Sequence, residues 1–137
     1  MPSAVTDHPA APSAAAQAHF RAKLGFETDC SDVHRAMTGQ GADFVLLDVR
    51  GPDLYAAGHL PGARNLPHGK MTAGRMAEWP PEVLFVVYCA GPHCNGADKA
   101  ALRLAGLGRP VKLMIGVVTG WLDEGFALER QAEAARA

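Results

Sequence analysis

Residues 83–96 read VLFVVYCAGPHCNG, and this stretch decides the fold class of the chain. Its first part, residues 83–88, is an apolar run without polar alternation, and residues 44–47 form a second run of the same kind. Short apolar runs rich in β-branched residues are typical of strands that are buried on both faces of a parallel sheet. The second part is a cysteine and a short loop, which leads into an alanine-rich segment with helical spacing.

Helices and shorter strands are expected to alternate with these two strands. Residues 13–24 and 96–107 predict helices, because both segments are rich in alanine and are followed by glycine. We expect Ser13 to cap the first helix, and Ser31 or Asp32 to cap another that follows it. The other expected elements are a strand within residues 26–30, a strand at 111–115, a short helix at 119–124 and a helical or frayed end at 128–137. This alternation predicts an α/β domain with a mainly parallel sheet.

The size and composition of the chain fit one ordinary globular domain. We expect residues 1–12, which are rich in proline, alanine and serine, to form a flexible tail, and residues 13–137 to form the domain. The net charge of -1 and the lack of a basic block argue against nucleic acid or an anionic membrane as a partner. No apolar run reaches the roughly 20 residues that cross a bilayer, and no signal peptide is recognisable.

The three cysteines argue against a disulfide framework and favour a reducing cytoplasm, where thiols serve for reactivity or packing. Cys89 stands directly after a predicted strand, at the edge where parallel sheets bind their ligands. The amides of the following loop and the helix N-terminus can favour a thiolate there, which is the nucleophilic form. A small cysteine buried at a strand end is the alternative, and position alone does not decide between the two.

Several motifs taken in order resemble the rhodanese-like superfamily, from about residue 26 to residue 127. They are Asp48-Val49-Arg50 after a strand, Gly58-His59-Leu60-Pro61-Gly62-Ala63, Asn65-Leu66-Pro67, Val86-Val87-Tyr88-Cys89 with its loop, and the segment from Leu113 to Trp121. The resemblance implies a three-layer domain with a central five-stranded, mostly parallel sheet flanked by helices. It also implies a sulfurtransferase that moves sulfane sulfur from thiosulfate or a persulfide donor to a thiol or cyanide acceptor, without a metal or organic cofactor.

The resemblance also assigns roles to residues by position. Cys89 would be the catalytic nucleophile that carries the persulfide, and Asp48 and Arg50 would support the site. The anion-binding loop would consist of Ala90, Gly91, Pro92, His93, Cys94 and Asn95, with Gly91 and Gly96 allowing positive φ and close approach.

This sequence departs from the family pattern in three places. Cys94 stands where the common loop has an arginine, which would clamp an oxyanion with two hydrogen bonds, so thiosulfate binding is expected to be weak. The absence of that arginine also counts against phosphatase or arsenate reductase chemistry. The loop looks about two residues longer than usual, and Val117 stands where the family often has glycine. Lys99 is a candidate replacement cation, although a solvated lysine is the simpler interpretation.

Cys94 has three interpretations that the sequence leaves open. It could be a second, resolving thiol that attacks the Cys89 persulfide, releases sulfide and leaves a Cys89–Cys94 disulfide. It could be a packing thiol, or it could join Cys89, His93 and His59 in a zinc site, although the spacing is unusual for zinc. The rival functions are a non-catalytic binding or regulatory module and a Cys89/Cys94 thiol–disulfide redox protein. The oligomeric state is undetermined, with a homodimer as one option.

Overall fold

Five parallel strands form the centre of the structure, a computed structural model that describes residues 2–131. The strand order is β1-β5-β4-β2-β3, and each neighbouring pair is parallel. In chain order the strands are β1 (Glu27–Thr28), β2 (Val45–Asp48), β3 (Arg64–Asn65), β4 (Phe85–Tyr88) and β5 (Val111–Met114). The expected five-stranded, mostly parallel sheet is therefore confirmed.

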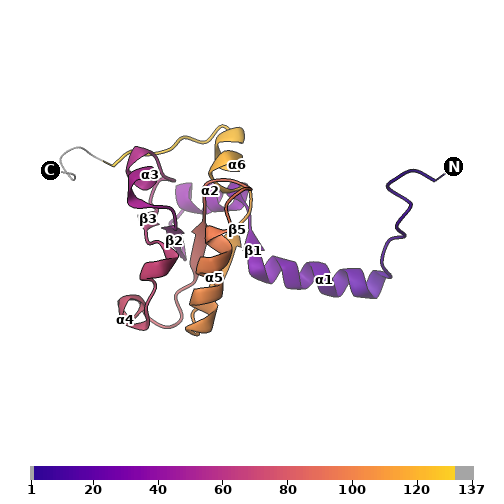
Figure 1. Cartoon of the computed structure of the whole chain (residues 1–137), viewed down its shortest axis with the longest axis horizontal. Helices are drawn as coiled ribbons and strands as arrows, with labels where there is room; N and C mark the ends of the chain where they lie inside the picture. Colours follow the sequence, from indigo (N-terminus) through magenta and orange to yellow (C-terminus); the bar gives the residue numbers. More distant parts are fainter. Residues whose placement is uncertain (1, 132–137) are drawn as a thin grey trace.

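Helices cover both faces of this sheet, as Figure 1 shows. The helices in chain order are α1 (Ser13–Phe26), which projects from the domain, α2 (Cys30–Thr38), α3 (Pro52–Ala57), the 3-10 helix η1 (His68–Lys70), α4 (Ala73–Met76), α5 (Gly96–Gly106) and α6 (Val117–Asp123). One core lies between the sheet and α5, and the other lies between the sheet, α2 and α6. The fold is the predicted three-layer α/β arrangement.

The two cores are filled by alternate residues of the same strands. Leu47 and Val87 pack into the core on the α5 side, whereas their neighbours Leu46 and Val86 pack into the core that contains Trp121. Successive side chains of a strand point to opposite faces, so a strand covered on both faces needs apolar residues at every position. This explains why the strand segments at 44–47 and 83–88 show no polar alternation.

Some predicted boundaries were wrong for local reasons. Ser13 is the first residue of α1 and not its cap, because Pro12 occupies the cap position without a side-chain hydrogen bond. The cap of α2 is Asp29, whose carboxylate accepts from the backbone N–H of Asp32 at 2.8 Å. Capping oxygens bond to an amide two or three residues further on, so Ser31 and Asp32 stand too late in the chain. The two-residue strand β3 is too short to give a periodic signal.

The chain end was also partly mispredicted. Residues 128–131 are not helical, because Glu129 pairs its backbone with His59 through hydrogen bonds of 2.9 Å and 2.8 Å. The rest of the expected helical or frayed end, residues 132–137, lies outside the described residues. Residues 126–131 therefore form an extended segment, the C-terminal strap, which is hydrogen-bonded to the end of α3 and to His59.

The N-terminal part projects from the domain. Residues 2–12 are exposed and contain no helix or strand, and α1 extends away from the sheet (Figure 1). No residue of α1 is buried. Within residues 2–131, no helix combines the length and the apolar character that a bilayer crossing requires.

A buried polar cluster lies at the carboxyl ends of β2 and β4. Asp48 is fully buried, and its carboxylate accepts a hydrogen bond from the Tyr88 hydroxyl at 2.7 Å. The same hydroxyl accepts the backbone N–H of Leu60 at 3.1 Å, so it also holds the turn after α3. Burial, followed by the charge of Asp48, raises the pKa of Tyr88 above its ordinary value. The hydroxyl therefore keeps its proton and remains a donor.

Replacing Tyr88 with phenylalanine should destabilise the protein by about 1–3 kcal/mol, because a buried carboxylate oxygen would lose one of its donors and the N–H of Leu60 would lose its acceptor. Urea unfolding followed by circular dichroism measures this change. The matched control is Tyr55→Phe, which removes a half-buried hydroxyl that donates to the Ala63 carbonyl at 2.6 Å. Equal losses for the two variants would contradict the role assigned to the Tyr88 hydroxyl.

Candidate functional site

Cys89 is the first residue after β4, and its side chain lies on the α5 side of the sheet. The residue is only 2% exposed, yet it lines a pocket of about 540 Å³ at the carboxyl edge of the sheet. Residues 90–95 form the loop over this pocket, and α5 begins at Gly96. The predicted strand–loop–helix arrangement is present, with the cysteine at the strand end.

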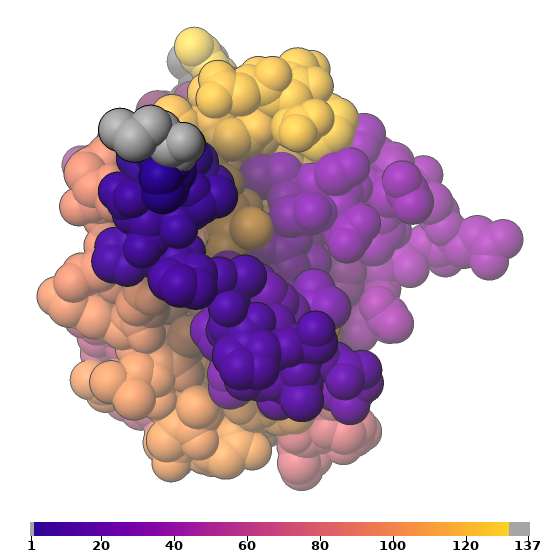
Figure 2. Space-filling model, turned by 90° about the vertical axis from the view of Figure 1, so that its right-hand side faces the viewer, coloured from indigo at the N-terminus to yellow at the C-terminus, as the bar shows by residue number. Residues whose placement is uncertain are grey.

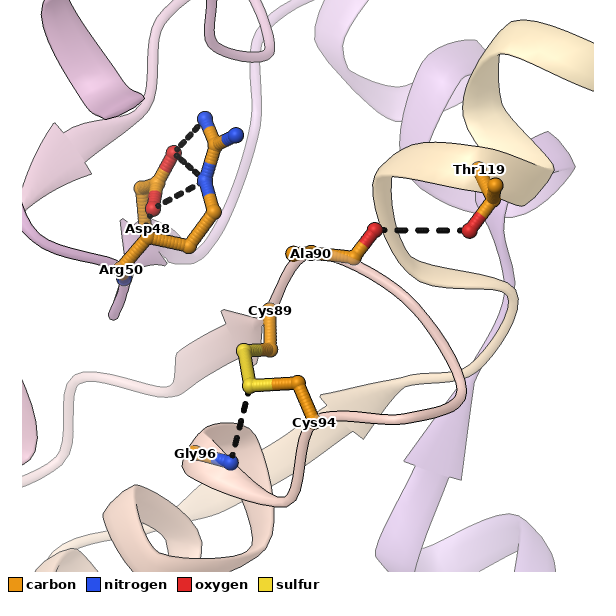
Figure 3. Close-up of a disulfide and its surroundings, with 7 residues drawn as sticks. All are labelled: Asp48, Arg50, Cys89, Ala90, Cys94, Gly96 and Thr119. Atoms are coloured by element: carbon orange, nitrogen blue, oxygen red, sulfur yellow. Dashed lines mark hydrogen bonds and ion pairs between the residues drawn. A yellow bond between two sulfur atoms is a disulfide. The ribbon is translucent and has the colours of Figure 1, made fainter.

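Cys89 and Cys94 are joined as a disulfide within this loop (Figure 3). Their Cα atoms are 6.5 Å apart, a separation at which disulfides commonly form. A turn brings them together, because the N–H of Cys94 donates to the Gly91 carbonyl at 3.0 Å. The N–H of Gly96, at the start of α5, donates to the Cys94 sulfur at 3.4 Å. The structure therefore brings the two candidate thiols together beside a helix N-terminus.

The start of α6 anchors the other side of the loop. The N–H of Val118 donates to the Cys89 carbonyl at 3.2 Å, and the Thr119 hydroxyl donates to the Ala90 carbonyl at 3.4 Å (Figure 3). The turn before these residues places Val117 at φ 54°, in the left-handed region that β-branched residues rarely adopt. Residue 117 is the position where the resembled superfamily often has glycine. The turn forms here with valine at that position.

The positive φ expected at Gly91 and Gly96 is wrong, whereas the expected close approach of the backbone is present at Gly96. Neither Gly91 nor Gly96 has a positive φ. A Cβ at Gly96 would lie 3.2 Å from the Cys89 sulfur and 3.4 Å from the Cys94 sulfur. A Cβ at Gly91 would lie 2.8 Å from the His93 ring. Glycine at these positions lets the backbone approach the sulfurs and the loop close over them.

Arg50 lines the pocket, but its guanidinium group is directed to Asp48 (Figure 3). It donates to the two carboxylate oxygens of Asp48 and to the Gly58 carbonyl. Burial lowers the pKa of Arg50, but the hydrogen bonds and charge of Asp48 outweigh burial and raise it. Both residues thus lie next to the Cys89 loop, and Arg50 is committed to an internal ion pair rather than to a bound anion.

The remaining ionisable groups of the pocket are basic. His68, His93 and Lys99 line it together with Arg50, and none of the described lining residues is an aspartate or glutamate. Lys99 is exposed and lies in the first turn of α5. Because Arg50 is already paired with Asp48, Lys99 is the cation of this lining that can attract an anion, and the His68 and His93 rings add hydrogen-bonding nitrogens.

Two pocket features were missed by sequence reasoning. His68 belongs to η1, which packs against α5, and it directly follows the Asn65-Leu66-Pro67 segment already noted. Leu54, which is 55% exposed, forms an apolar part of the rim. The proximity of both residues depends on tertiary structure, so no local pattern could have indicated it.

The structure does not bring together the four residues of the zinc interpretation. His59 lies apart from the pocket, stacks on the Tyr55 ring at 3.9 Å and contacts Glu129. Within the described part of the chain, no group of three histidine, cysteine or acidic side chains is arranged to hold a metal ion. Cys89, His93 and Cys94 do share the pocket, but the fourth proposed ligand has a different role.

Cys30 lies on the opposite face of the sheet. Its residue is 5% exposed, and its thiol donates to the carbonyl oxygens of Ile115 at 3.5 Å and Val117 at 3.6 Å. Burial, followed by the charges of Asp29 and Glu124, raises the pKa of Cys30 to about 11. A buried thiol with a raised pKa is unreactive, so Cys30 serves as a packing residue.

Comparison with known sequences identifies the family to which this arrangement corresponds. The sequence model of the rhodanese-like domain matches residues 29–124. An HTH-type transcriptional regulator of Mycobacterium tuberculosis is 33% identical over 93 residues, which cover 68% of this chain and 41% of the regulator. The thiosulfate sulfurtransferase GlpE of Pseudomonas entomophila is 38% identical over 74 residues, which cover 53% of this chain and 62% of GlpE. The chain thus spans less than two thirds of either relative.

Solved structures show the same fold. A Bacillus halodurans protein matches with a TM-score of 0.83 and 33% identity, covering 87% of each chain. This share of our chain is larger than residues 27–137 alone would give, so the likeness extends into the N-terminal segment. A thiosulfate sulfurtransferase from Pseudomonas aeruginosa matches with a TM-score of 0.65 and 25% identity, over 82% of this chain and 21% of that one.

In the reduced, folded protein at pH 8, iodoacetamide should label the Cys89 loop and leave Cys30 unmodified. With a pKa of about 11, Cys30 is ionised in only about one molecule in a thousand at that pH, and the thiolate is the reactive form. Peptide mass spectrometry after timed labelling measures each site. In denaturant all three cysteines should react, which controls for peptide recovery. Labelling of Cys30 as fast as Cys89 in the folded protein would contradict this assignment.

Proposed function

The chain belongs to the rhodanese-like domain family, and from this premise we propose that it is a sulfurtransferase that carries sulfane sulfur as a persulfide on Cys89. The observation that carries the proposal is the position of Cys89, at the end of β4, beside the α5 N-terminus and in a pocket with basic lining. The likeness to GlpE, a thiosulfate sulfurtransferase, supports the same reaction class. The donor is thiosulfate or a persulfide, and the acceptor is a thiol or cyanide.

The reaction begins with the reduced pair. The Cys89 thiolate attacks the outer sulfur of the donor, the donor's S–S bond breaks, and sulfite or a thiolate leaves with the electron pair. Cys89 then holds the transferred sulfur as a persulfide, whose negative charge is stabilised by the N–H groups at the start of α5 and by the basic pocket. An acceptor thiolate or cyanide attacks that outer sulfur and regenerates the Cys89 thiolate.

Cys94 gives the persulfide a second route. The Cys94 thiolate attacks the inner sulfur of the Cys89 persulfide, the outer sulfur leaves as hydrosulfide, and a Cys89–Cys94 disulfide forms. A dithiol or two thiol molecules supply the two electrons that reduce this disulfide and reset the site. The short turn that joins the two cysteines supports this route, and a reducing compartment such as the cytoplasm suits it.

The same disulfide favours a second candidate function, a thiol–disulfide redox protein that never carries sulfane sulfur. In that function the Cys89–Cys94 pair would exchange electrons directly with a partner thiol. The two functions differ in what Cys89 holds during turnover, a persulfide in the first and only a disulfide in the second. A non-catalytic binding module would hold neither.

Incubating the reduced protein with thiosulfate, and separately with glutathione persulfide, should add one sulfur atom to Cys89. Intact mass spectrometry of wild type, Cys89→Ser and Cys94→Ser measures this addition. The added sulfur should disappear in Cys89→Ser and should persist longest in Cys94→Ser, because the resolving attack is then absent. A folded protein that gains sulfur from neither donor would contradict the sulfurtransferase proposal.

Replacing Lys99 with glutamine should raise the KM for thiosulfate about 1.4- to fivefold, because an exposed charge contributes only about 0.2–1 kcal/mol to an ion pair. Steady-state kinetics at low and high salt measure this effect, which should shrink as salt screens the charge. The matched control is Lys70→Gln, an exposed lysine outside the pocket lining. A KM that is unchanged at low salt would remove Lys99 from the binding site.

A further inference from the structure

Helix α1 presents apolar side chains to solvent. Phe20, Leu24 and Phe26 are 58%, 72% and 69% exposed, and no residue of the helix is buried. Phe20 and Leu24 are four residues apart and therefore lie on the same face of the helix. A 14-residue helix is marginally stable by itself in water, and α1 contacts β5 and β1 while leaving these apolar side chains exposed.

A groove lies along this apolar face, between α1 and the rest of the domain. Figure 1 shows α1 leaving the domain beside β1, and Figure 2 shows a hollow between α1 and the body of the molecule. The groove has a volume of about 440 Å³ and is lined by Phe20, Leu24 and Ile115 together with residues of β1, β5 and the start of α2. We call it the α1 groove. Its lining combines these three apolar side chains with charged ones, among them Lys23, Asp32 and Lys112.

The charges on the arm and at its root are complementary. The arm carries Arg21 and Lys23 and no acidic residue, whereas the segment that follows it holds Glu27, Asp29 and Asp32. Lys23 already pairs with Glu27 in the same chain at 2.7 Å. Arg21 has no ion pair or hydrogen-bond partner among residues 2–131. The arm is therefore basic and the segment that follows it is acidic, while Lys112 of β5 adds one positive charge to the groove.

We propose that the α1 groove binds helix α1 of a second copy of this chain, in a two-fold symmetric dimer with reciprocal arms. In a two-fold dimer the same contact occurs twice, so an arm and a root of opposite charge on one chain satisfy both contacts. The charges set the register. The two arms cross near Phe26, so that Arg21 of one copy lies against Asp29 and Asp32 of the other.

The residues before Phe20 fit this arrangement. Ala14, Ala15, Ala16 and Ala18 give this part of the arm a small-residue surface, which lets a helix approach another surface closely. In the dimer this part of the arm continues past the crossing point toward the partner copy's groove. The exposed Ile115 at the end of β5 provides an apolar contact there.

The α1 groove shares no lining residue with the Cys89 pocket, so the dimer does not depend on the sulfur chemistry. The proposal predicts a particle of twice the 14.4 kDa chain mass by light scattering coupled to size exclusion of the full chain. Phe20→Asp combined with Leu24→Asp should give a monomer without loss of folding, because both side chains are exposed in the single chain. The control Leu102→Asp, also at an exposed leucine but on α5, should remain a dimer.

A charge exchange tests the register. Arg21→Asp and Asp32→Lys should each weaken dimerisation about tenfold in sedimentation equilibrium, and the double variant should restore much of the affinity, because it rebuilds the pair with reversed signs. Circular dichroism confirms that each variant folds. A wild-type monomer at every concentration tested, a dimer that survives the Phe20 and Leu24 changes, or a double variant no tighter than the single ones would overturn the proposal.

Discussion

The rest of the site depends on the hydrogen bonds that the buried carboxylate of Asp48 accepts. It accepts hydrogen bonds from the Tyr88 hydroxyl, from the Arg50 guanidinium and from the Arg50 backbone N–H, while the Asp48 carbonyl accepts the N–H of Leu66. A buried charge is tolerated only when it is paired and fully hydrogen-bonded, and removing one partner of such a pair costs about 3–5 kcal/mol. Asp48 thus links β2 to β4 through its carboxylate and to the segment after β3 through its backbone carbonyl, at the edge of the sheet where the pocket opens.

These hydrogen bonds of Asp48 with Tyr88 and Arg50, which we call the Asp48 clamp, also determine where the Cys89 side chain points. Tyr88 and Cys89 are consecutive, and successive side chains near a strand end point to opposite faces. Because the clamp holds the Tyr88 side chain in the core with Trp121, the Cys89 side chain turns to the α5 side, next to the helix N-terminus. The Arg50 guanidinium donates to Asp48 as part of this clamp. The loop of residues 90–95 contains no arginine. The pocket therefore lacks a bidentate arginine clamp for an anion.

The sequence was sufficient for the features that depend on composition and period. The apolar runs ending at Asp48 and Cys89 predicted the central strands, and the alanine pattern after Gly96 predicted α5. It was insufficient wherever tertiary structure decided the outcome. The two-residue β3 exists because it pairs with β2, and the strap at Glu129 is extended because it pairs with His59. The roles predicted for the site residues remain predictions, although the structure brings Cys89 and Cys94 together.

The most direct test of the account is a single turnover without added thiol. The reduced protein is loaded with glutathione persulfide, the excess donor is removed, and released sulfide is measured together with the free thiols of Cys89 and Cys94. The account predicts stoichiometric sulfide release, with simultaneous conversion of the Cys89 persulfide and the Cys94 thiol to a disulfide, and retention of the persulfide in Cys94→Ser. Sulfide released equally fast from Cys94→Ser, or a wild-type persulfide that persists unchanged, would contradict it.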